Sequence, residues 1–114
     1  MTIETYNYDQ PISGDGPIEH VDITIAEGES VAQYAPLVLD AELGQYKVAL
    51  ATDTAAQFLA SFAVDASAGA VVHHAIKSIT IDPDFVAWPD EMTDIVKAGL
   101  FAGTPIATQS PRAR

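Results

Sequence analysis

The chain has 114 residues, 48% of them hydrophobic, which is enough for one domain with a core and too few for two. Its formal net charge of −11 at pH 7 would repel nucleic acid and anionic lipid. It has no cysteine, which excludes a disulfide framework and thiolate metal sites and fits synthesis in a reducing cytoplasm.

The acidic residues are concentrated in the first part of the chain. No lysine or arginine precedes Lys47, and the segment before it carries Glu4, Asp9, Asp15, Glu19, Asp22, Glu27, Glu29, Asp40 and Glu42. These acids either serve solubility or let this half of the chain dock against a neutral or basic protein surface.

We expect no signal peptide, because residues 1–6 hold neither a basic residue nor an apolar run. No apolar run approaches the length that spans a bilayer.

Residues 1–20 are predicted to form an extended arm that becomes ordered on a partner. Glycine and proline are too dense here for a long regular element, at Pro11, Gly14, Gly16 and Pro17. Isoleucine and tyrosine nevertheless make this segment more apolar than a typical flexible linker. The apolar side chains of the arm are Ile3, Tyr6, Tyr8, Ile12 and Ile18.

Most of the remaining chain has the patterns of short β-strands. Strands are predicted at 21–25, 35–40, 45–50 and 71–81, from alternation or from short apolar runs bounded by turns. Segment 57–65 also alternates, with Phe58 and Phe62 on one face and Leu59 on the other. Asp82-Pro83-Asp84 ends the longest run, because proline cannot serve a central ladder.

Only residues 89–100 have helical spacing. Pro89 suits a first turn, and the charges follow the helix dipole, with Asp90, Glu91 and Asp94 before Lys97. An apolar stripe is formed by Met92, Ile95, Val96 and Leu100. A last strand at 104–108 precedes a polar tail at 109–114. The sequence therefore predicts a mainly β domain at 21–108 with one short α-helix.

Neither histidines nor carboxylates form a convincing metal site. His73 and His74 are adjacent in a predicted strand, so their side chains point to opposite faces, and His20 is distant in sequence. We expect surface or interface histidines instead. The acids of 82–84 and 90–91 lack the spaced oxygen ligands and central glycine of a calcium loop, so we expect solvated turn and cap acids.

No catalytic motif is present either. Ser61, Ser67 and Ser78 lack the context of a nucleophile elbow, and Gly14-Asp15-Gly16 is not followed by the lysine of a phosphate loop. Trp88, the only tryptophan, is either a ligand platform or, as we expect, a core or interface aromatic. We therefore predict a protein that is not an enzyme and holds no cofactor or metal.

The order of these segments resembles the head decoration protein D family of tailed bacteriophages. The likeness covers residues 35–108 and rests on order and spacing. It is carried by Ala35-Pro36-Leu37-Val38-Leu39-Asp40, Tyr46-Lys47-Val48-Ala49, 55–66, Lys77-Ser78, Val86-Ala87-Trp88-Pro89 and Phe101-Ala102-Gly103-Thr104-Pro105-Ile106. The most specific parts are 36–40, Trp88-Pro89 and 101–104. Residues 1–34 match only in kind, as an arm.

The resemblance implies a β-clip-like fold and a homotrimer on the outer surface of an expanded capsid, made in the host cytoplasm. Such a protein is a cement that helps the shell resist packaged DNA, and its N-terminal arm adds β-structure to the major capsid protein. The arm residues given above would then bind the capsid. Structural core or trimer contacts would be formed by Leu37, Leu39, Phe58, Phe62, Trp88, Pro89 and Phe101.

Two other classes remain open at this point. One is a small β-rich module that binds carbohydrate or peptide, with Trp88 exposed beside acidic turns. The other is a small hydrolase with a cleft at a trimer interface, for which the sequence offers no motif.

Overall fold

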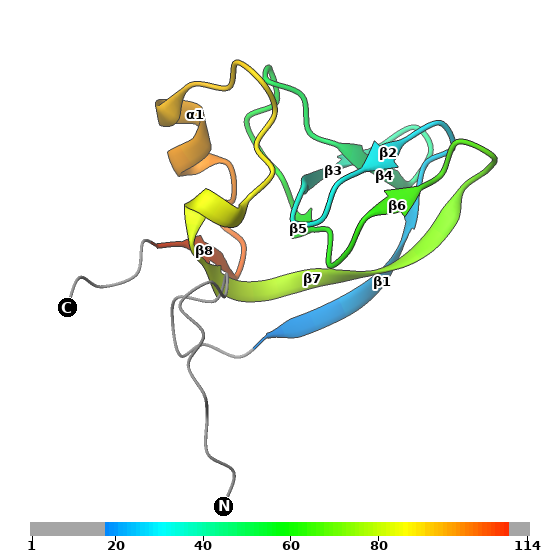
Figure 1. Cartoon of the computed structure of the whole chain (residues 1–114), viewed down its shortest axis with the longest axis horizontal. Coiled ribbons are helices and arrows are strands. Elements are labelled where there is room, and N and C mark those ends of the chain that lie inside the picture. The colour runs from blue at the N-terminus through cyan, green and yellow to red at the C-terminus, as the bar shows by residue number, and fades with distance from the viewer. Residues whose placement is uncertain (1–17, 110–114) are drawn as a thin grey trace, which may run out of the picture.

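The computed structural model describes residues 18–109 and shows a mainly β body with one short α-helix, which confirms the predicted fold class (Figure 1). Most of the predicted arm, with Ile3, Tyr6, Tyr8 and Ile12, lies outside the described residues, as do residues 110–114 of the tail. The elements are β1 (Glu19–Ile25), β2 (Ser30–Val31), β3 (Pro36–Asp40), β4 (Gln45–Val48), β5 (Phe58–Leu59), β6 (Val64–Asp65), β7 (Val71–Ile81), the 3₁₀ helix η1 (Pro83–Phe85), α1 (Asp94–Gly99) and β8 (Ile106–Thr108).

Five strands close into a small ring. The larger sheet has the order β1-β4-β3-β5-β7-β8, and an additional pairing joins β1 to β7. That antiparallel pairing is the most extensive, running from Glu19 opposite Ser78 to Ile25 opposite Val71. β8 extends the sheet by pairing in parallel with the end of β7, and β2 pairs with β6 in a separate small sheet.

The core has two parts, which follow one another along β7. Ala75 belongs to one part, whereas Ile76, Ile79 and Ile81 belong to the other. The first part lies among α1, η1 and β8, which gather at one end of the molecule (Figure 1), and is centred on Leu59, Ile81, Leu100 and Phe101. The second lies between β1, β3 and the small sheet, and is centred on Ile23, Ile25, Leu37 and Ala66.

The strands predicted around the hairpin and in the long apolar run are confirmed. β3 and β4 pair antiparallel across the turn at 41–44, with Leu39 opposite Tyr46. Gly44 supplies the left-handed φ of 67° that this turn needs, and its N–H donates to the Asp40 carbonyl at 2.8 Å. β1 begins at Glu19, so the last two residues of the predicted arm belong to the body.

The alternation over 57–65 does not produce one strand, and here the prediction was wrong. The chain forms β5, bends, and enters β6 in the other sheet. Within the segment Leu59 is fully buried, whereas Phe62, which follows the bend, is 54% exposed. The bend is fixed at Ser61, whose N–H donates to Nε2 of His73 at 3.1 Å. This long-range contact leaves no local signal in the sequence.

The helix is also shorter than predicted. α1 begins after Thr93, whose hydroxyl caps it by accepting from the Val96 N–H at 3.3 Å. Pro89 does not start it, because Glu91 has a left-handed φ of 68° that interrupts the helical backbone. Ile95, predicted in the apolar stripe, is 86% exposed.

Candidate functional site

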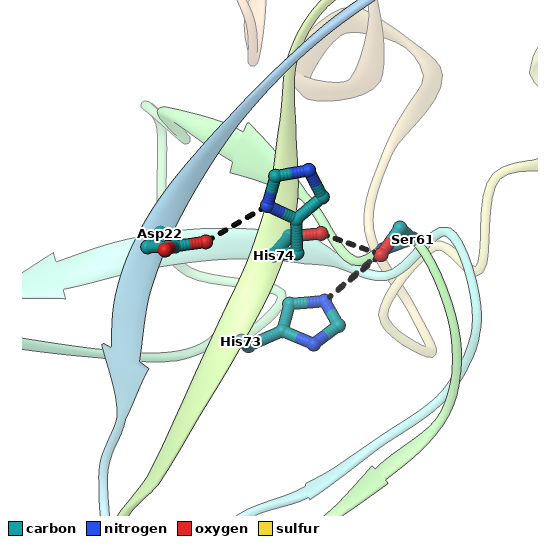
Figure 2. A network of polar contacts seen from close by, with 4 residues as sticks. All are labelled: Asp22, Ser61, His73 and His74. Atoms are coloured by element: carbon teal, nitrogen blue, oxygen red, sulfur yellow. Dashed lines mark hydrogen bonds and ion pairs between the residues drawn. The ribbon is translucent and has the colours of Figure 1, made fainter.

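The two adjacent histidines of β7 lie on opposite faces, as the strand alternation predicts. The side chain of His73 is 1% exposed, whereas that of His74 is 61% exposed. Figure 2 shows the two rings leaving the strand in different directions, with Asp22 beside His74 and Ser61 close to both residues. The expectation of surface or interface histidines was therefore wrong for His73, which is a buried side chain.

His73 is held by the bend that follows β5. Its Nε2 accepts from the Ser61 N–H, and its ring meets the Phe62 ring edge-on with the ring centroids 4.7 Å apart. Its Nδ1 is buried and has no hydrogen-bond partner. Burial, and secondarily the positive charge of a protonated His74 nearby, lower the pKa of His73. The folded chain therefore favours a neutral imidazole here.

Ser61 and His73 lie close together but are not arranged for nucleophilic catalysis. An activated serine must donate its hydroxyl proton to the imidazole, and a third group must orient that imidazole. Here the hydroxyl donates to the His74 carbonyl oxygen at 2.6 Å, while its Oγ is 3.5 Å from Nε2 of His73. The lone pair of Nε2 is already engaged by the Ser61 N–H, so the contact serves to fix the bend.

A second polar cluster lies on the outward face of β1 and β7. Nδ1 of His74 is 2.8 Å from Oδ1 of Asp22, and both side chains are largely exposed (Figure 2). The ring of His20 stacks on that of His74, with centroids 4.6 Å apart and planes 8° apart. Within residues 18–109, no group of three or more histidine, cysteine, aspartate or glutamate side chains is arranged to hold a metal ion. Sequence reasoning missed this cluster, because only the strand register brings His20 to His74.

Trp88 is a half-buried aromatic and offers no free ligand platform. Its indole N–H donates to the Pro83 carbonyl oxygen at 2.9 Å. Its ring packs against that of Phe101 at 6.4 Å, and the Lys97 amine lies 5.7 Å from its centroid. The expectation of a core aromatic thus describes Trp88 better than that of an exposed binding surface.

The other residues predicted as core or trimer contacts fall into three groups. Leu37 and Phe101 are buried, and Phe58 and Pro89 are partly buried. Leu39 and Phe62 are about half exposed, so neither is a core residue of the isolated chain. Leu39 lies near the end of β3, and Phe62 follows the bend at Ser61.

The acidic turns act as local caps. Asp82, at the end of β7, accepts from the Asp84 N–H at 3.0 Å and caps η1.

A groove of about 240 Å³ lies between α1 and β8, where Lys97 and Thr104 are among the lining side chains. No carboxylate or imidazole lines it. The groove therefore presents the Lys97 amine and threonine hydroxyls, and it has no pair of side chains for acid–base catalysis.

No protein-family model matches the chain, and a search of curated proteins finds no match. Between residues 18 and 109, no helix is long and apolar enough to cross a membrane.

Proposed function

We propose that this protein is a capsid decoration protein, a cement that binds the outside of an expanded phage head as a homotrimer. Its partners would be further copies of itself and the major capsid protein. Neither nucleic acid nor a membrane is required. Its work would be mechanical, since binding that favours the expanded shell stabilises that shell by mass action.

One observation carries the proposal: the three most specific parts of the resemblance meet in one core. Val38, from the segment 36–40, belongs to the same buried cluster as Phe101, and Trp88 packs against that cluster. The rings of Trp88 and Phe101 are in contact. Segments far apart in sequence thus form one structural unit, which is what a signature that specifies a fold requires.

The surface is suited to protein contacts. Several large apolar side chains are well exposed, and they are spread over different parts of the body: Leu39, Leu43, Leu50, Phe62, Val72 and Ile95. A trimer seated on a shell would cover several of these faces at once. The chain's net charge of −11 suits a protein that meets a basic protein surface and avoids the genome.

Electron microscopy of phage heads mixed with the purified protein tests the proposal. Expanded heads should acquire extra density at three-fold and quasi-three-fold positions, and unexpanded heads should remain bare. Mass photometry of the free protein should give the mass of three chains. Heads that stay undecorated at saturating protein, or decoration that ignores expansion, would refute this function.

A further inference from the structure

The outward face of the β1–β7 ribbon brings two imidazoles and a carboxylate together. His20 and Asp22 are two residues apart on β1, so their side chains share one face. Asp22 lies directly opposite His74 in the antiparallel register. The chain contains three histidines, and two of them, His20 and His74, meet across β1 and β7.

The carboxylate fixes which nitrogen of His74 is available. Asp22 in its ionised form only accepts hydrogen bonds, so the proton of a neutral His74 ring is on Nδ1. The lone pair then lies on Nε2. This carboxylate–imidazole pair is the arrangement that orients histidine ligands in metal sites and raises their basicity. The stacked ring of His20 places a second imidazole beside the first.

We propose that His20 and His74 form a two-nitrogen site for a borderline divalent cation such as Zn²⁺, with Asp22 orienting His74 and water completing the coordination. Imidazole nitrogen suits zinc, copper and nickel, whereas magnesium and calcium prefer oxygen ligands. The acidic character of the whole chain would raise the local concentration of cations.

The site requires only a small adjustment of exposed side chains. Two nitrogens on one tetrahedral Zn²⁺ at about 2.0–2.1 Å lie roughly 3.3 Å apart. The ring centroids are now 4.6 Å apart and the planes are parallel, so one ring must turn for both lone pairs to meet at one ion. His20 is exposed and the His74 side chain is 61% exposed, so neither ring is locked by packing.

A bound ion would join β1 to β7 close to the point where β1 begins. It would bind the folded chain only, because the two histidines meet only when the ribbon is formed. Binding would therefore raise the thermal stability of the body, by an amount that grows with the logarithm of the free metal concentration once this exceeds the Kd. This site is independent of decoration, since none of its residues belongs to the segments that carry the resemblance.

Titration of the untagged full chain with Zn²⁺ at neutral pH tests the site. Calorimetry should show saturable binding of one ion per chain, and the imidazole proton signals of His20 and His74 should move while those of buried His73 should not. Thermal unfolding should shift upward with Zn²⁺ and not with Mg²⁺. His20→Ala and His74→Ala should each abolish the saturable binding and the thermal shift.

Two further variants make the test specific. Asp22→Asn should weaken Zn²⁺ binding by about 10–100-fold, the usual effect of losing the carboxylate behind a ligand histidine. Val72→Ala is the matched control, because Val72 is 70% exposed and stands two residues before His74 on the same face. It should bind as the wild type does. Zn²⁺ binding that survives His74→Ala unchanged, or no saturable binding by the wild type, would overturn the proposal.

Discussion

Acidification should weaken the fold through His73. In the unfolded chain this imidazole titrates near the ordinary value of about 6.5, whereas burial lowers its pKa in the folded chain. As pH falls, the unfolded state therefore takes up the proton first. The free energy of unfolding should be unaffected by His73 above pH about 6.5, fall below it, and level off once the folded chain is protonated too.

The size of this loss in the free energy of unfolding follows from the protonation of one group, His73, and from the contacts of its ring. Between the two pKa values, a single group lowers the free energy of unfolding by up to about 1.4 kcal/mol per pH unit. In the neutral ring, Nε2 accepts from the Ser61 N–H at 3.1 Å. Protonation would put an N–H on Nε2, so two donors would face each other. Oγ of Ser61 is 3.5 Å from Nε2, at the limit of a hydrogen bond, and the buried Nδ1 has no partner, so the imidazolium would be poorly compensated.

Urea unfolding between about pH 7.5 and about pH 5.5 measures this effect. His73→Gln keeps a side-chain acceptor near the position of Nε2 but cannot titrate, so its free energy of unfolding should change less with pH than that of the wild type. His74→Gln is the matched control. It should retain most of the wild-type pH dependence, because burial is the larger cause of the lowered pKa of His73. Identical pH dependence in His73→Gln and the wild type would refute the reasoning.

Other predictions address the body and the arm. Trp88→Ala should lower the free energy of unfolding by about 2–3 kcal/mol, less than the roughly 3–5 lost at fully buried aromatics, and a near-zero change in urea would contradict its packing role. Trp88→Phe should cost about 1 kcal/mol for the lost indole hydrogen bond. Gly103→Ala should cost about 1–2 kcal/mol, because φ there is 83° while no atom lies within 4 Å of an added Cβ. Deletion of residues 1–17 should leave a folded trimer that no longer decorates expanded heads in electron microscopy. Added salt should weaken decoration by the full chain in a pelleting assay, and salt-independent binding would contradict an electrostatic role of the acids.

Much of the fold follows from local pattern. β7 has the bounds that its β-rich composition and the following Asp82-Pro83 predict, and the β3–β4 hairpin follows from two apolar runs around a glycine turn. These elements are specified by neighbours in sequence, so a single sequence suffices. The pairing that closes the ring of strands, in contrast, is not specified by neighbours in sequence. The pairing of β1 with β7 joins residues about fifty apart, and alternation alone does not say which strands meet.

The errors share one physical cause, which is a tertiary contact or backbone conformation that overrides a local period. Segment 57–65 alternates as a strand does, yet the hydrogen bond from Ser61 to His73 bends it between two sheets. The helical spacing over 89–100 is genuine only after Thr93, because Glu91 adopts a left-handed conformation. Exposed Ile95 shows the same limit, since an apolar residue at a helical position is buried only where a partner covers it.

The histidine cluster depends on register more than any other feature. If β1 and β7 slipped by one residue, every side chain of β1 would change faces, and Asp22 would no longer meet His74. That slip is opposed by the inward residues Ile23 and Ile25, which are buried in the second part of the core. The same core that buries His73 on one face of β7 therefore presents His74 beside Asp22 on the other. The acid response of His73 and the proposed Zn²⁺ binding by His74 therefore both depend on the same register between β1 and β7.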